Sequence, residues 1–443
     1  RMKTESLLPI AKEALRLAQK KGAAHAAASV SRSRNVDLDW RDGRVENVQE
    51  ATSRELSVQL YVDGRYSAVS TSDFRPDALE RFIDDAVAMT RLLAVDPHRK
   101  LPEPALWQNL SRDDLQLVDP KRATVDTALR TRTAKALEDA VRAHPQRGRL
   151  LSVSTSFGDV DSQLALVHSG GFEAERWSTS FGMGAMASVK DDDGRRPMEG
   201  SYASARFLEG LPSADELGRD AMLRTLARLG TKKAPSTQVP MVVENRVAGR
   251  LLAMLFGPLS GAALYQKRSF FEGKLGTLVA SSKLTVIDEP LLPRGLGSRH
   301  FDNEGLAARR MPVFDKGILR NAFVDTYYAR KAGLSPTTGG PSNLVFEKGQ
   351  KSLDELIASL QDGFLVTGFN GGNSNSTTGD FSVGISGFRV RKGERAEAVS
   401  EMNVSGNHLT FWKQLAAVGN DPYAYSSVRT PSLFFESVQF AGT

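Results

Sequence analysis

Cysteine is absent from this chain of 443 residues. Its absence excludes disulfides, thiolate zinc sites, iron–sulfur clusters and cysteine nucleophiles. Histidine is scarce, and no two of the six lie near each other in the sequence: His25, His98, His144, His168, His300 and His408. This spacing excludes a zincin helix, which presents two imidazoles on one face. A metal site assembled from distant histidines and carboxylates stays open.

Common nucleotide and hydrolase motifs are also missing. The chain has no Gly-x-Ser-x-Gly elbow, Walker A loop or EF-hand loop. Gly182 and Gly184 imitate part of a dinucleotide fingerprint, but that motif needs a following helix whose N–H groups face a pyrophosphate. Residues 188–194 are instead typical of a strand end and a turn. We therefore expect no cofactor in this chain.

Long apolar runs are lacking too. None approaches the roughly 20 residues that cross a bilayer, and the polar, amphipathic N-terminal segment is not typical of a signal peptide. We expect a cytoplasmic protein with no membrane partner. The formal net charge of +6 comes from basic residues that are mostly interleaved with acidic ones. This pattern favours a solvated surface over a nucleic-acid interface.

The first 230 residues predict an N-terminal α+β domain. Apolar spacing predicts helices over 5–21, 76–93, 122–143 and 213–229, the last starting at a capping box of Ser213 and Glu216. Alternating patterns and the turns Asp42-Gly43 and Asp63-Gly64 predict strands between them. These strands are expected at 36–40, 45–49, 56–62 and 67–70, with a further series from 150 to 207.

Residues 231–443 predict a β-rich C-terminal domain. The polar stretch 230–240 contains two prolines and is predicted to be the linker. Beyond it, helices are expected over 246–256 and 353–360, among strands broken by glycine. Gly368–Gly379 has low complexity and predicts a mobile loop. Because neither half shows a βαβ rhythm, the predicted fold class is α+β.

Two acidic clusters are candidates for chemistry. Asp191–Asp193 predict a solvated hairpin tip, because turns favour aspartate and like charges repel. Asp302 and Glu304 could act as paired carboxylates or bind a hard cation. The favoured interpretation is an acidic turn closed by Gly305.

The C-terminal half resembles the TldD/PmbA family, also called the modulator of DNA gyrase family. The resemblance rests on short motifs in family order over roughly residues 240–443, and the N-terminal half fits more loosely. The motifs are Ser269–Gly276, Leu284–Pro290, Phe301–Gly305, Lys316–Leu319, Thr378–Gly384 and Val418–Asp421.

One branch of that family, TldD-like, carries His-Glu-x-x-x-His on a helix and binds zinc. The matching stretch here runs from Gly249 to Pro258, with Ala253 and Pro258 at the histidine positions and Met254 at the glutamate position. Alanine and proline have no side-chain ligand atom, and methionine cannot act as a general base. The chain is therefore similar to the PmbA/TldE-like branch, which implies no catalytic, cofactor-binding or metal-binding residue of its own.

The resemblance implies a partner. It implies a heterodimer with a TldD-like zinc-bearing subunit that cleaves unfolded or extended peptides, including peptide precursors and antitoxins. The segments 269–276 and 368–379 are the candidate partner surface, and a substrate could add as a strand to a sheet edge.

Two alternatives stay open. One is an independent hydrolase that uses carboxylates such as Asp302, Glu304 or Asp380. The other is a binding protein associated with gyrase or nucleic acid.

Overall fold

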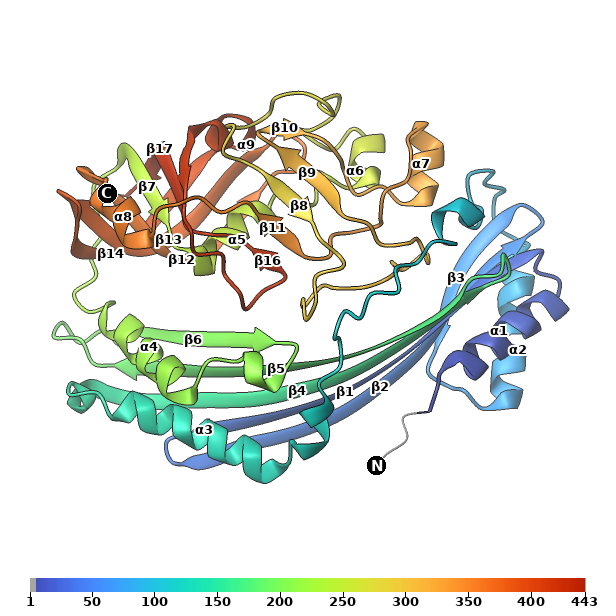
Figure 1. Cartoon of the computed structure of the whole chain (residues 1–443), viewed down its shortest axis with the longest axis horizontal. Helices are drawn as coiled ribbons and strands as arrows, with labels where there is room; N and C mark the ends of the chain where they lie inside the picture. The colour runs from blue at the N-terminus through green and yellow to red at the C-terminus, as the bar shows by residue number, and fades with distance from the viewer. Residues whose placement is uncertain (1–4, 443) are drawn as a thin grey trace.

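A long arched sheet forms the N-terminal half (Figure 1), and the computed structural model describes residues 5–442. The six strands are antiparallel, in the order β3-β2-β1-β4-β5-β6. Their bounds are β1 His25–Arg41, β2 Arg44–Val62, β3 Arg65–Thr71, β4 Leu150–His168, β5 Glu173–Val189 and β6 Met198–Ala205. The C-terminal half lies over the concave side of the arch, as Figure 1 shows.

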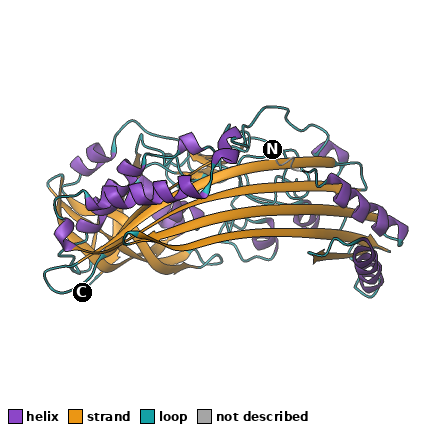
Figure 2. Cartoon of the chain, turned by 90° about the horizontal axis from the view of Figure 1, so that it is seen from below, coloured by secondary structure: helices purple, strands orange, loops and turns teal. Residues whose placement is uncertain are grey.

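Two pairs of helices cover the two ends of the arched sheet, as seen from below in Figure 2. At one end, α1 (Leu8–Lys20) and α2 (Pro76–Thr90) pack on residues that include Ala28 and Val30 of β1. At the other end, α3 (Thr127–Arg142) and α4 (Ala214–Leu226) pack on β4, β5 and β6. Leu38 of β1 packs with Ala134 of α3. Because Ala28, Val30 and Leu38 are all even-numbered on one strand, both helix pairs use the same face.

The hairpins follow the turn chemistry predicted from the sequence. Asp42 and Gly43 have φ of 45° and 87°, and Asp63 and Gly64 have φ of 50° and 76°. Two successive left-handed residues make the tight turn whose twist matches that of the flanking strands. The β1–β2 hairpin is longer than predicted, because the patterns at 45–49 and 56–62 belong to one continuous strand, β2.

Within residues 5–442, no strand pairs with the outer edge of the arch along the first half of β2. Strand β3 pairs with β2 only from Leu56 onward, and every residue from Arg44 to Glu55 is exposed. On its other side this segment pairs with β1, where Arg34 forms an ion pair with Glu50 at 2.7 Å.

The C-terminal half contains two further sheets. Their orders are β14-β13-β12-β7-β17-β15 and β10-β9-β8-β11-β16, and an additional β14–β17 pairing closes five strands into a ring. The strand bounds of the first sheet are β7 Thr237–Val243, β12 Asp362–Ser374, β13 Asp380–Arg391, β14 Glu394–Asn407, β15 Leu415–Val418 and β17 Leu433–Ala441. Those of the second are β8 Val286–Asp288, β9 Met311–Asp315, β10 Ile318–Leu319, β11 Leu344–Phe346 and β16 Val428–Arg429.

Short helices connect these strands. The α-helices are α5 Asn245–Ala253, α6 Gly261–Tyr265, α7 Thr326–Ala332, α8 Leu353–Ala358 and α9 His408–Phe411. Single 3₁₀ turns are η1 Pro104–Leu106, η2 Pro120–Thr124, η3 Arg147–Arg149, η4 Leu208–Gly210 and η5 Trp412–Gln414. Mixed helices and strands with a β-rich C-terminal region confirm the predicted α+β class. None of the helices within residues 5–442 has both the length and the apolar character needed to span a membrane.

Three local predictions were wrong. Residues 237–240 of the predicted linker belong to β7, which pairs with β12 and β17. The predicted loop at 368–379 continues β12 as far as Ser374. Asp191 is buried rather than solvated, because its carboxylate accepts hydrogen bonds from the N–H groups of Asp192 at 2.7 Å and Gly230 at 2.8 Å.

Candidate functional site

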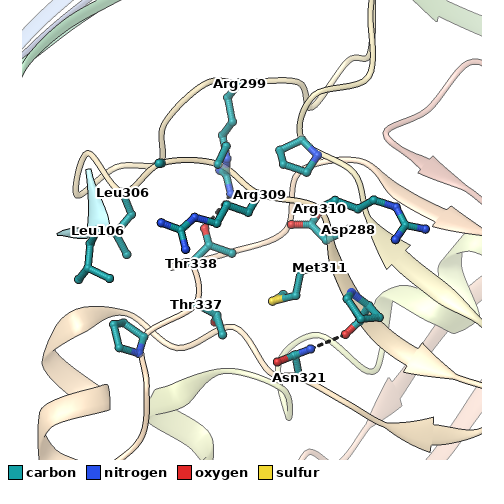
Figure 3. Close-up of a pocket in the computed structure, with 15 residues that line it drawn as sticks. Leu106, Asp288, Arg299, Leu306, Arg309, Arg310, Met311, Asn321, Thr337 and Thr338 are labelled. Atoms are coloured by element: carbon teal, nitrogen blue, oxygen red, sulfur yellow. Dashed lines mark hydrogen bonds between the residues drawn. The ribbon is translucent and has the colours of Figure 1, made fainter. Parts of the chain in front are cut away.

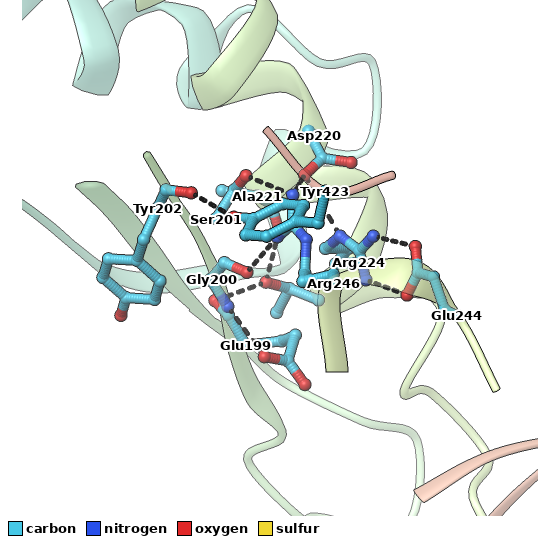
Figure 4. Close-up of polar contacts among 11 residues, drawn as sticks. Glu199, Gly200, Ser201, Tyr202, Asp220, Ala221, Arg224, Glu244, Arg246 and Tyr423 are labelled. Atoms are coloured by element: carbon cyan, nitrogen blue, oxygen red, sulfur yellow. Dashed lines mark hydrogen bonds and ion pairs between the residues drawn. The ribbon is translucent and has the colours of Figure 1, made fainter. Parts of the chain in front are cut away.

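The N-terminal end of α5 is anchored by a charged network between the two halves of the chain (Figure 4). Glu244 precedes α5 and forms a bidentate ion pair with Arg224 of α4, one branch of which is 3.0 Å long. Arg246 on α5 donates to Asp220 of α4 at 2.8 Å and to Ser201 of β6 at 3.0 Å. The side chains of Arg224 and Glu244 are only 18% and 13% exposed. This burial strengthens the attraction and fixes where α5 begins.

The segment between β15 and β17, residues 419–432, lies over the same junction. Asp421 accepts hydrogen bonds from the backbone N–H and the hydroxyl of Ser432 at 2.9 and 2.7 Å, which closes the loop. Its backbone oxygen accepts from Asn245 of α5 at 2.6 Å. Tyr423 donates to the backbone oxygen of Tyr202 at 3.1 Å. Asp421, the last residue of the motif Val418–Asp421, therefore stabilises the conformation of this loop.

The three residues that the sequence analysis placed at the positions of the zinc motif lie at the C-terminal end of α5 and just beyond it. Ala253 is exposed, Met254 is half-buried against the large C-terminal core, and Pro258 is buried. The backbone oxygen of Pro258 accepts from Ser269 at 2.7 Å. A methyl group, a thioether and a pyrrolidine ring do not provide the nitrogen and oxygen donors that a His-Glu zinc site uses. These residues do not fit a zinc ion.

The α5 helix ends earlier than the sequence predicted. It stops at Ala253 rather than at residue 256, and turns follow in which Leu255 and Phe256 donate to oxygens three residues back, at 3.0 and 3.2 Å. The ring of Pro258 would crowd the carbonyl of Met254, four residues earlier, in a continued helix. The tighter turns still bury Leu255.

A free strand edge lies beside α5. Strand β7 pairs with β12 only as far as Val366. Beyond this point β13 is the one strand of the described part of the chain that pairs with β12. Arg250 of α5 donates to the backbone oxygens of Phe369 at 2.9 Å and Gly371 at 2.6 Å. The guanidinium thus satisfies two carbonyls that a neighbouring strand would otherwise bind. Sequence inspection missed this contact, because residues about 120 positions apart leave no local pattern.

His408 is packed at the far end of the same strand. Its ring stacks between Phe270 and Phe381, at centroid distances of 5.4 and 4.6 Å. Its Nε2 lies 2.9 Å from the Oγ atom of Ser374, and its buried Nδ1 has no partner within residues 5–442. Burial lowers the pKa of His408 to about 4. A nucleophilic pair needs a third group to orient the histidine, so this Ser–His contact serves packing.

Acid should destabilise the protein through His408. The unfolded histidine takes up a proton below its ordinary pKa of 6.5, while the folded one stays neutral until about pH 4. The contribution of His408 to the unfolding free energy is therefore fully present above about pH 6.5. It is lost as the pH falls toward 4, at about 1.4 kcal/mol per pH unit. We expect His408→Phe to reduce this slope by that amount in urea titrations at several pH values. A slope that His408→Phe leaves unchanged would contradict this.

The carboxylates of Asp302 and Glu304 both accept hydrogen bonds from neighbouring parts of the chain. Asp302 is buried and accepts from the N–H groups of Glu304 and Leu306 at 2.9 and 3.0 Å, and from Thr338 and Gly339 through its second oxygen. Glu304 accepts from the backbone N–H and the hydroxyl of Thr326 at 3.0 and 2.6 Å. This geometry supports the acidic-turn interpretation, with Gly305 at φ of 87°.

Other candidate residues are not brought together. Asp380 is exposed at the β12–β13 turn, where Thr378 and Asn407 donate to it, both at 2.9 Å. Within residues 5–442, no three histidine or acidic side chains gather in a way that could hold a metal ion. Gly184 lies within β5, where a Cβ atom would be 2.4 Å from the ring of Tyr202. This glycine makes room for a side chain rather than for a phosphate.

Family comparisons cover most of the chain. A family model described as the PmbA/TldA metallopeptidase C-terminal domain matches residues 236–442. Two models of the same family, described as domain 1 and the central domain, match residues 26–90 and 120–229.

Two metalloproteases are similar in sequence. Metalloprotease PmbA of Escherichia coli O157:H7 is 28% identical over 422 residues, which cover 94% of this chain and 92% of that protein. A metalloprotease of Methanothermobacter thermautotrophicus is 26% identical over 404 residues, covering 88% of this chain and 86% of that protein.

Solved structures are similar over nearly the whole chain. A Bacteroides thetaiotaomicron protein described as a modulator of DNA gyrase is 42% identical, with a TM-score of 0.94 and coverage of 98% of both chains. TldE from Thermococcus kodakarensis has a TM-score of 0.86 at 19% identity, covering 98% of this chain and all of that one. The second likeness concerns the fold alone.

Proposed function

Because the chain belongs to the PmbA/TldD metallopeptidase family, we propose that it is the metal-free subunit of a heterodimeric zinc peptidase. The observation that carries this proposal is the end of α5, where Ala253, Met254 and Pro258 leave no metal ligand on an otherwise folded and anchored segment. The chain keeps the fold of the family, but these three side chains can neither bind zinc nor act as a general base. The zinc ion, the general base and the bond cleavage then belong to a TldD-like partner.

The substrate that suits this arrangement is an unfolded or extended peptide. The free edge of β12 offers backbone groups that an added strand can pair with, and such pairing reads the backbone more than the sequence. Arg250 now occupies two of these carbonyls, so a peptide that binds here has to displace its guanidinium. Peptide precursors and antitoxins belong to this class of substrate.

The alternative of an independent carboxylate hydrolase has less support. A general acid or base needs a proton-transfer position that is free for substrate. Both oxygens of Asp302 already accept hydrogen bonds, Glu304 is bound to Thr326, and Asp380 is exposed and bound at a turn. A binding role associated with gyrase or nucleic acid has no feature of the site in its favour.

Zinc content tests the proposal directly. We expect this chain, purified alone, to hold well below one zinc per chain by elemental analysis, because a zinc site needs three or four protein ligands. Co-expressed with a family member that carries His-Glu-x-x-x-His, it should co-purify as a pair with about one zinc. Tight stoichiometric zinc in this chain alone would overturn the proposal, and so would failure of the two chains to associate.

A further inference from the structure

A cavity of about 290 Å³ lies where the two halves of the chain meet, and no residue of α5 lines it (Figure 3). Leu106 enters it from η1 of the N-terminal half, where its backbone oxygen accepts from Ala307 at 2.8 Å. The rest of the lining comes from β8, β9 and the segments beside them, from Asn321 after β10, and from residues 336–338 after α7. Its apolar members include Leu306, Met311 and three prolines, Pro290, Pro312 and Pro336.

The charge lining this cavity is unbalanced. Three arginines, Arg299, Arg309 and Arg310, face a single acidic residue, Asp288. In Figure 3 the side chains of Arg309 and Arg310 extend in opposite directions, and that of Arg299 comes from the loop above them. Arg310 is already paired with Glu289 at 3.3 Å. Arg299 and Arg309 therefore share one carboxylate, that of Asp288, and one positive charge is left unmatched.

Both of these arginines have unused donors. Arg299 donates through Nη2 to Thr338 at 3.1 Å and to the backbone oxygen of Gly340 at 2.5 Å, but its buried Nε has no partner among the described residues. Arg309 is exposed and makes no ion pair with any residue from 5 to 442. A buried guanidinium N–H that is left unpaired is costly. A ligand carboxylate in the cavity could accept from the outer nitrogens of the two guanidinium groups and so offset this cost.

We propose that this cavity binds a small carboxylate that carries an apolar side chain, such as the C-terminal residue of a peptide. The planar forks of Arg299 and Arg309 match a carboxylate, and Leu306, Met311 and the prolines match the apolar part. The peptide source rests on the proposed function, because peptide cleavage releases new C-termini.

The carboxylate of Asp288 in the lining of the cavity favours a singly charged ligand over a doubly charged one. Asp288 is buried and accepts from the N–H and the hydroxyl of Ser342, both at 2.7 Å. Burial raises the pKa of Asp288. A doubly charged phosphate would be repelled by this carboxylate more strongly than a monoanion, and it would leave the apolar wall uncovered.

The test uses the whole chain without a partner, so that its result is independent of any peptidase activity. N-acetyl-L-leucine, N-acetyl-L-leucinamide and inorganic phosphate are titrated separately and followed by calorimetry. We expect the acid to bind at least about tenfold more tightly than the amide or phosphate, since charge-assisted hydrogen bonds are the stronger kind. Arg309→Gln should weaken binding of the acid about tenfold.

Arg320→Gln serves as the matched control. Arg320 is an exposed arginine outside the cavity, paired with Asp315, and its loss should leave binding of the acid unchanged. Equal binding of acid and amide, tighter binding of phosphate, or equal losses in the two arginine variants would each overturn the carboxylate site. The zinc and co-purification results would stand in any of these cases.

Discussion

An unstructured fluorogenic peptide should be cleaved by the mixture of this chain with a zinc-bearing family member, and left intact by this chain alone. We expect at least about a hundredfold difference, because removing the groups that perform a chemical step costs several orders of magnitude in rate. On the proposed function, Ala253, Pro258 and Met254 stand where the partner has its zinc ligands and base. An obligate interface that assembles the active cleft typically buries more than about 2,000 Å².

Three controls make the assay decisive. A chelator should abolish cleavage by the mixture, and so should replacement of the glutamate in the partner's motif. The partner should be assayed alone at the same concentration. Cleavage by this chain alone that survives the chelator would exclude the partner-subunit role and favour the independent hydrolase.

Replacing Arg224 by methionine should cost about 3 kcal/mol of unfolding free energy, the order measured when one member of a buried ion pair is removed. Arg224 binds Glu244 through two hydrogen bonds and Asp220 through a third, at 3.1 Å. Without it, Glu244 keeps a charge that is only 13% exposed. Urea denaturation of the purified chain measures the change.

Arg219→Met is the matched control on the same helix. Its partner is Asp215, four residues earlier, and the two side chains are 66% and 58% exposed. Such surface pairs contribute about 0–1 kcal/mol, so this change should be nearly neutral. The double variant Arg224→Met, Glu244→Gln should recover part of the loss, because the stranded charge is gone. Equal effects of Arg224→Met and Arg219→Met would mean that the junction does not stabilise the chain.

Local chemistry made much of the fold predictable. The capping box of Ser213 and Glu216 is formed as expected, because both partners lie within one helical turn. The Asp-Gly turns fixed the β1–β2 and β2–β3 hairpins for the same reason. The apolar pattern predicted a helix as far as residue 256, whereas α5 ends at Ala253, before the point where the ring of Pro258 would crowd a carbonyl of a continued helix.

Contacts between distant residues could not be predicted in this way. The glycines and polar residues of 368–379 are typical of a loop, and β12 extends into them because β13 pairs with it and Arg250 binds its other edge. Asp191 is buried because it binds the N–H of Gly230, nearly forty positions away. The Arg224–Glu244 pair joins two helical segments whose approach depends on the whole fold.

The open half of β2 has a consequence for how the molecule behaves among its own copies. A strand edge as long as Arg44–Glu55, paired with β1 on its other side, can nucleate fibres, because each arriving chain would extend the sheet and expose a new edge. Five ionised side chains interrupt this segment: Arg44, Glu46, Glu50, Arg54 and Glu55. If a second copy paired with this edge, these charged side chains would lie beside those of the added strand and lose part of their hydration. These charges therefore disfavour strand pairing between copies along the outer edge of β2.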